Sequence, residues 1–232
     1  MKKRDVILSY KSLNFDQKIY QIKAYEYIKK VLKKGEIFLE LGCADGSFAS
    51  FVSQTTKAKA IGLDISTASV KDAKKLGVNV KIHDLAKRFP FQNEKFDVIV
   101  ALEVIEHLLD NESFVEEIHR VLKKKGYLVL STPNLASLTN RIRLLFGKYP
   151  KYLSTTWKTQ DYHAHLYTPE LMKRQLENAG FKIVIFSSPN FLNPIITKSY
   201  CPNFIKTLSM RLGDIFPTIG SHMVLLARKT KN

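Results

Sequence analysis

Short apolar runs alternate with helix-like segments along most of the chain, and this alternation is the feature that most limits the folds open to it. The runs typical of strands are residues 36–42, 58–66, 78–85, 95–103, 127–133, 181–188 and 221–229. The segments with apolar residues at helical spacing are 16–34, 47–54, 67–77, 111–126 and 168–180. This order of strands and helices predicts an α/β fold with a doubly wound, mostly parallel seven-stranded sheet.

Local signals bound some of these elements. Asn111 is expected to cap a helix that ends at Gly126, because asparagine favours helix starts and glycine favours helix stops. Thr168 is expected as the N-cap of a later helix, with Pro169 at its first position. Residues 95–103 form a nearly continuous apolar run, which indicates a strand covered on both faces.

The 232 residues are enough for one domain with its own core. We expect a single domain over residues 1–232, in which residues 1–35 form an N-terminal helical cap. Segments 135–167 and 189–220 interrupt the alternation, and long connections in compact domains are often lids or binding loops. We expect both segments to cover an acceptor. Their aromatic residues include Phe146, Tyr149, Tyr152, Trp157, Tyr162, Tyr167, Phe191, Tyr200 and Phe204.

Charge and composition leave several partner classes open. The formal net charge is +16, which attracts nucleic acid, anionic lipid or acidic small molecules, although scattered lysines also fit a solvated surface. Residues 137–153 are basic and amphipathic, so contact with a membrane surface is one alternative. No apolar run approaches the roughly 20 residues of a membrane-spanning helix. The two cysteines, Cys43 and Cys201, imply no disulfide framework, which together with the lack of a signal peptide predicts a cytoplasmic protein.

The stretch LELGCADGSF, residues 39–48, falls where the first expected strand passes into a helix. Gly42 and Gly46 allow a tight turn there and a close approach of a ligand to the backbone. The spacing E-x-G-x-A-x-G differs from the G-x-G-x-x-G of dinucleotide-binding sites. Glu40 would repel a pyrophosphate, so the turn favours a ligand that carries a cation or many hydroxyls.

Acids also follow the next two expected strands. Asp64 lies about 20 residues after the first turn, where a carboxylate can bind both hydroxyls of a ribose. Asp84 follows the third strand and could accept a hydrogen bond from an exocyclic amine. The alternatives are structural, because Asp64 could cap a helix and Asp84 could form a turn.

In this combination the chain resembles the class I S-adenosylmethionine-dependent methyltransferases, which have a Rossmann-like fold. The matching stretches between residues 37 and 134 are LELGCADGSF, GLDIS, HDLAKRFPF, FDVIVALEVIEHL and VLKKKGYLVLSTPN. Ala44 departs from the family, since many members have glycine there. The cofactor residues that the resemblance implies are Glu40, Gly42, Cys43, Ala44, Gly46, Asp64, Ile65, Asp84, Leu85 and Leu102.

The resemblance also assigns parts of the cofactor. Glu40 and the turn 42–46 would hold the methionine part, Asp64 the ribose hydroxyls and Asp84 the adenine. The sulfonium and ammonium groups of S-adenosylmethionine would explain why an acid stands beside the turn. S-adenosylhomocysteine would be the product, formed by in-line displacement of the methyl group, which needs alignment and, at oxygen, removal of a proton.

The stretch LEVIEHL follows the fourth expected strand and offers groups for that proton transfer. If it is helical, Glu103, Glu106 and His107 share one face. The expected catalytic residues are these three and His165. In one version His107 is the general base. In another, less favoured, a divalent cation is held by Glu103, Glu106, His107 and His163. In a third, His107 only shapes the pocket.

We therefore expect a methyltransferase that acts on a small-molecule acceptor, at oxygen. The ubiquinone-biosynthesis O-methyltransferases carry a similar E-x-x-E-H segment. The first alternative is an RNA 2′-O-methyltransferase with a metal site, because small-RNA methyltransferases also carry this segment and the charge suits RNA, although no RNA-binding module is recognisable. The second is a non-catalytic S-adenosylmethionine-binding protein, since the three acids concern the cofactor alone. The sequence does not name the acceptor.

Overall fold

The computed structural model describes residues 18–151, 163–190 and 203–230. The strands are β1 (Ile37–Leu41), β2 (Lys59–Asp64), β3 (Asn79–Ile82), β4 (Phe96–Leu102), β5 (Leu122–Pro133), β6 (Phe181–Ser187) and β7 (His222–Lys229). They form one sheet in the order β3-β2-β1-β4-β5-β7-β6. The first five strands are parallel, and β7 runs antiparallel between β5 and β6. The expected doubly wound, mostly parallel fold is confirmed.

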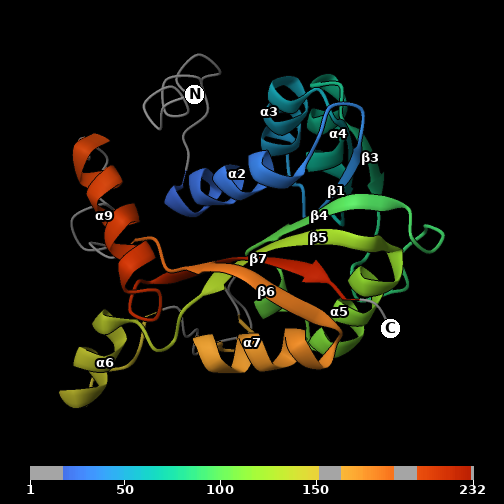
Figure 1. Ribbon diagram of the computed structural model, residues 1–232. Coiled ribbons are helices and arrows are strands. Elements are labelled where there is room, and N and C mark those ends of the chain that lie inside the picture. The colour runs from blue at the N-terminus through green and yellow to red at the C-terminus, as the bar shows by residue number, and fades with distance from the viewer. Residues whose placement is uncertain (1–17, 152–162, 191–202, 231–232) are drawn as a thin grey trace.

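Helices cover both faces of the sheet (Figure 1). They are α2 (Ile19–Val31), α3 (Ser47–Thr56), α4 (Thr67–Lys75), η1 (Ile105–His107), α5 (Asn111–Val121), α6 (Leu138–Leu145), α7 (Pro169–Asn178) and α9 (Asn203–Ile215). Tyr25 of α2 and Phe51 of α3 pack with Phe38 in one core, whereas Phe114 of α5 packs with Leu39 in the other. Neighbouring residues of β1 thus serve opposite cores, because side chains alternate along a strand. None of the helices in the described part of the chain is long and apolar enough to cross a membrane.

The helix that was expected to reach Gly126 is shorter than predicted. It ends at Val121, and β5 begins at once with Leu122, which pairs with Phe96 of β4. Leu122 is fully buried, so its pairing and packing outweigh the helix propensity of the lysine run that follows. The lysines consequently lie on a strand at the amino edge of the sheet.

One predicted cap is wrong and another is confirmed. The N-cap of α5 is Asp110 rather than Asn111, and its Oδ1 accepts a hydrogen bond from Ser113 N at 3.0 Å. Thr168 caps α7 as expected, because its Oγ1 accepts from Leu171 N at 3.3 Å. Both caps satisfy backbone donors that the first helical turn leaves unpaired.

Part of segment 189–220 is the helix α9. Two glycines of this segment, Gly213 in the helix and Gly220 at the segment's end, lie against Ser188. A Cβ on Gly213 or on Gly220 would overlap the Ser188 carbonyl oxygen, so both positions need glycine. Lys23 of α2 donates to Asp214 Oδ2 at 2.8 Å and holds the other side of the helix. Residues 1–17, 152–162 and 191–202 of the expected cap and lids lie outside the described ranges.

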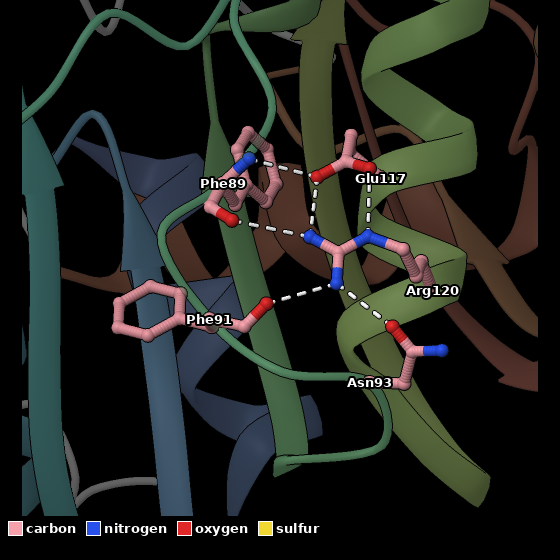
Figure 2. A network of polar contacts seen from close by, with 5 residues as sticks. All are labelled: Phe89, Phe91, Asn93, Glu117 and Arg120. Atoms are coloured by element: carbon pink, nitrogen blue, oxygen red, sulfur yellow. Dashed lines mark hydrogen bonds and ion pairs between the residues drawn. The ribbon is translucent and has the colours of Figure 1, made fainter.

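Arg120 of α5 fastens the loop between β3 and β4 (Figure 2). Its guanidinium donates to Phe91 O at 2.8 Å, to Asn93 Oδ1 at 2.9 Å and to Phe89 O at 3.1 Å. The carboxylate of Glu117 accepts from Arg120 and from Phe89 N, and hydrogen bonding to Arg120 lowers the pKa of Glu117. Arg120 and Glu117 therefore fix the loop that follows β3 to helix α5.

Replacing Arg120 by methionine should lower the free energy of unfolding by roughly 2–3 kcal/mol, because three loop acceptors and a carboxylate lose a charged donor. Urea denaturation measures the change. The matched control is Lys75→Met, which removes an ion pair to Asp72 at the same helical spacing but with exposed side chains. The control substitution should lower the free energy of unfolding by less than about 0.5 kcal/mol. If both variants lost the same free energy of unfolding, the loop would not depend on Arg120.

Candidate functional site

The turn after β1 excludes side chains for two reasons, its backbone and its neighbours. Gly42 has a φ of +67°, and a Cβ there would lie 2.7 Å from Val104 Cγ2. Gly46 has a φ of +73°, and its Cβ would lie 2.6 Å from Ala73 Cβ. Ala44, where the resemblance expects glycine, also has a positive φ of 43°. The protein's own packing thus requires both glycines, whatever ligand approaches the turn.

Asp64 at the end of β2 ties this turn to the next one. Its Oδ2 accepts from Ala44 N and its Oδ1 from Ser66 N, both at 2.8 Å. The cap of α4 is Ser66, which accepts from Ser69 N at 3.2 Å, so the alternative role of Asp64 as a helix N-cap is excluded. Each carboxylate oxygen has a second lone pair that can accept from a ligand hydroxyl.

The strand order places all the implied cofactor residues along one edge. β3, β2, β1 and β4 are neighbours, and their carboxyl ends carry or precede the residues in question. Asp84 also forms a turn, which is the structural role that the sequence left open for it. Its Oδ1 accepts a hydrogen bond from Ala86 N at 3.0 Å. Leu85 and Leu102 are half-buried against the cores, Ile65 is exposed, and Cys43 is buried against Gly62.

Glu40 is a buried carboxylate that lacks a hydrogen-bond donor at one of its oxygens within the described ranges. It is only 5% exposed, and within the described ranges its Oε2 has no hydrogen-bond partner. Burial raises the pKa of Glu40 well above its ordinary value, and the nearby carboxylates of Asp45 and Asp64 raise it further. Such an oxygen fits a ligand that brings a donor or a positive charge, as the ammonium of S-adenosylmethionine would.

Glu103 leaves the end of β4 in a left-handed conformation, with a φ of +56°. Its N–H donates to Ser131 O at 3.1 Å, and its Oε1 accepts from Ser131 Oγ at 2.6 Å. Only Ile105–His107 forms a short 3₁₀ turn, so the predicted helix face shared by Glu103, Glu106 and His107 is wrong. Burial raises the pKa of Glu103 to about 7.

His222 stands beside Glu103, and no sequence motif singled it out. Its Nε2 lies 3.5 Å from Glu103 Oε2, and its Nδ1 lies 3.0 Å from Ser221 Oγ and 3.1 Å from Asn190 Nδ2. The ring of Tyr20 from α2 stacks on the imidazole at a centroid distance of 5.4 Å. Because β7 is antiparallel, its first residue lies at the carboxyl edge of the parallel strands.

The surroundings keep the imidazole of His222 neutral. Burial, together with the positive charges of Lys18 and His163, lowers its pKa to about 4. At neutral pH the contact with Glu103 is therefore not an ion pair. The one clue in the sequence was position, since a histidine opens the last strand directly after a long insertion.

A second group of possible ligands surrounds Glu106. Oxygen or nitrogen atoms of Glu106, His107 and His163 lie within 4.8 Å of one another. Glu106 is buried, and its Oε2 accepts from Thr132 Oγ1 at 3.0 Å. Glu103 is not part of this group, so the structure assembles three of the four residues in the predicted metal set.

His165 lies apart from those three ligand groups. Its Nε2 is 3.0 Å from the carbonyl oxygen of Leu109, and its backbone N–H donates to Glu106 O at 3.1 Å. Its side chain also lines a hollow of about 540 Å³ between α5 and α7. The predicted grouping of His165 with Glu103 and His107 is therefore not seen, and the side chain that approaches His107 is His163, with ring centroids 4.8 Å apart.

A family model described as a methyltransferase domain matches residues 17–185. A protein of Mycolicibacterium smegmatis named "Probable S-adenosylmethionine-dependent methyltransferase" is 37% identical over 101 residues, which are 43% of this chain and 39% of that protein. A ubiquinone biosynthesis O-methyltransferase of Chelativorans sp. is 26% identical over 154 residues, which are 63% of this chain and 59% of that enzyme. The chain thus spans less than two thirds of the length of both relatives.

Solved structures share the architecture. The crystal structure of a SAM-dependent methyltransferase from Thermotoga maritima superposes with a TM-score of 0.63 and covers 91% of both chains. The two sequences are 21% identical, so this likeness establishes the common fold alone.

Replacing Glu103 by glutamine should change how stability depends on pH. Because its folded pKa of about 7 exceeds the ordinary 4.5, the folded chain keeps a proton that the unfolded chain releases between these values. Stability from this group is therefore lost as the pH rises from about 4.5 to 7. The variant should gain roughly 2–3 kcal/mol over wild type between pH 5 and pH 8, measured by urea unfolding. Asp72→Asn should keep the wild-type slope, and an unchanged slope in Glu103→Gln would contradict the burial argument.

Proposed function

This chain belongs to the methyltransferase-domain family and is an S-adenosylmethionine-dependent methyltransferase, and we propose that it methylates a small-molecule acceptor at oxygen. The observation that carries the proposal is the pair of Glu103 and His222 at the end of β4. A carboxylate with a pKa of about 7 is matched to taking a proton from a hydroxyl near neutral pH. The name of the Chelativorans relative, an O-methyltransferase, supports the same chemistry.

In the proposed arrangement the cofactor supplies a methyl group that its sulfonium already activates. Asp64 would accept the ribose hydroxyls, Asp84 the adenine amine, and Glu40 would meet the ammonium. The turn from Gly42 to Gly46, with Cys43 and Ala44, would carry the methionine part, and Ile65, Leu85 and Leu102 would border the adenosine. The supporting observation is that all these residues lie along one edge of four adjacent strands.

Protein groups would handle the acceptor's proton. Ionised Glu103, fixed by Ser131, would accept the proton of the acceptor hydroxyl, since its side chain keeps 18% exposure. His222 would stay neutral and orient the carboxylate through its Nε2. Tyr20 stacks on the other side of the imidazole and limits water there. His107 remains the rival base, because it is exposed at the same edge.

The function itself is tested by finding the acceptor. With S-adenosylhomocysteine bound, quinols, lipids, sugars and RNA ends would be screened for a rise in melting temperature. Hits would then be assayed for transfer of labelled methyl from S-adenosylmethionine. An O-methylated small molecule among the products is the expected result, whereas transfer only to nitrogen, carbon or RNA would contradict the proposal. The proposal also keeps a cytoplasmic location for the protein.

Replacing Asp64 by asparagine should weaken S-adenosylhomocysteine binding about tenfold to a hundredfold, because charge-assisted hydrogen bonds to the ribose are each worth roughly 1.5–3 kcal/mol. Isothermal calorimetry gives the affinity. The control is Asp72→Asn on the exposed side of α4, which should bind as wild type does. Since Asp64 also holds the backbone of Ala44 and Ser66, the melting temperature without ligand is measured alongside. Unchanged affinity would remove Asp64 from the cofactor site.

Substitution of each residue separates the two candidate bases. If Glu103 takes the proton, the rate of methyl transfer should rise with pH through about 7, and Glu103→Gln should lower it at least a hundredfold. His107→Gln should then change the rate less than tenfold. The opposite pattern, with activity lost in His107→Gln alone, would assign the base to His107. Both rates are measured at saturating cofactor.

One observation favours a second candidate, a metal-assisted methyltransferase such as one acting on an RNA 2′-hydroxyl. A carboxylate and two imidazoles are a suitable donor set for a divalent cation. The ligand atoms of Glu106, His107 and His163 lie within 4.8 Å of one another, slightly wider than ligands at roughly 2.0–2.2 Å from one ion require. Loss of activity to a chelator, with recovery on adding Mg²⁺ or Mn²⁺, would support this candidate. Activity unaffected by the chelator would exclude it.

A further inference from the structure

Helix α6 turns its apolar residues toward solvent instead of the core. Leu145 is 80% exposed and Phe146 is 72% exposed, which is uncommon for side chains of this size. The further exposed apolar side chains of this helix and its C-terminal loop are Leu138, Ile142, Leu144 and Tyr149. Leu138, Ile142 and Leu145 follow at spacings of four and three, as on one face of an amphipathic helix.

Polar contacts hold α6, so its apolar face is not needed to fold it. Asn140, the one buried residue of the helix, accepts from Lys151 N at 2.8 Å. Leu138 N donates to Ile219 O at 2.8 Å, and Asn134 Nδ2 donates to Gly220 O at 2.8 Å. The last two bonds join the chain at the start of α6 to the segment between α9 and β7.

Helix α9 adds a second exposed apolar row. Phe204, Leu208 and Ile215 are spaced by four and seven residues and are exposed, with Phe204 at 72%. Both α6 and α9 project from the same side of the molecule, beyond the β5–β7–β6 part of the sheet (Figure 1). Exposed apolar rows on two helices that project from one side mark an interaction surface rather than a solvated one. We call the exposed residues of α6 and α9 the apolar face.

The charges around this face select the partner. Arg141, Arg143, Lys148 and Lys151 accompany the apolar residues of α6, and the sequence has no acid between residues 134 and 151. Arg141 Nε and Arg143 Nε donate to the backbone carbonyls of Ala136 and Tyr149, both at 2.7 Å, which orients the two guanidinium groups. A second copy of this chain would set these cations against their own counterparts, and such like-charge contact is unfavourable.

We propose that the apolar face of α6 and α9 docks onto an anionic phospholipid bilayer. Leu145 and Phe146 would enter the boundary between headgroups and acyl chains, while Arg141 and Arg143 would meet lipid phosphates. This combination of a basic rim and large apolar side chains is typical of helices that lie in the membrane surface. The proposal goes beyond methyl transfer and rests on none of its steps. Since α6 follows the carboxyl end of β5, docking would also bring the candidate site close to the bilayer.

Vesicle flotation with the full chain tests this proposal without cofactor or acceptor. The chain should float with phosphatidylcholine vesicles that contain phosphatidylglycerol, and bind pure phosphatidylcholine at least tenfold less. The double variant Leu145→Ser/Phe146→Ser should lose about tenfold or more in binding to the anionic vesicles. Arg141→Gln/Arg143→Gln should weaken binding and its dependence on salt.

A matched control sits on the other side of the molecule. Leu76→Ser/Lys75→Gln removes an exposed leucine and an exposed cation at the end of α4, and should float as wild type does. Unchanged melting temperatures would show that all variants fold. The proposal would be overturned if Leu145→Ser/Phe146→Ser bound like wild type, or if the control lost as much. It would also be overturned if the chain bound polyuridylate but no vesicles, or formed a dimer that only this variant abolished.

Discussion

The parallel register of β1 with its two neighbours fixes where the turn after β1, Asp64 and Glu103 lie. Leu41 pairs with Leu63 on one side and with Ala101 on the other, so the three strands end at one level. Gly42 N continues the ladder with a hydrogen bond to Leu63 O at 2.8 Å, which sets the height of the turn. The turn, Asp64 and Glu103 therefore reach the same edge of the sheet through strand pairing.

Three carboxylates at this edge are taken out of water. Burial raises the pKa of Glu40, Glu103 and Glu106 above their ordinary values, and the charge of Glu103 raises that of Glu106 further. Neither Glu40 Oε2 nor Glu106 Oε1 has a partner within the described ranges. A folded chain that keeps such groups is less stable than it could be, and bound ligands that supply donors or cations would relieve that cost.

The sheet could be predicted, and so could the edge along which the implied cofactor residues lie, because strand ends and helix starts are local patterns. The surroundings of Glu103 could not. Glu103 has a left-handed backbone that a non-glycine residue rarely adopts, so the expected helical spacing with Glu106 failed. His222 reaches the site only because β7 inserts antiparallel between β5 and β6, a topology that no short stretch of sequence encodes.

Ser188 links helix α9 to the first residue of β7. Its N–H donates to Gly213 O at 3.0 Å and its Oγ to His222 O at 2.8 Å, while its carbonyl oxygen fills the space beside Gly213 and Gly220. Because Ser188 is packed tightly against Gly213 and Gly220, a tilt of α9 would displace Ser188 and, through its hydrogen bond, the backbone of His222. A shift of α9 would therefore be transmitted through Ser188 to the backbone of His222, whose imidazole lies beside Glu103.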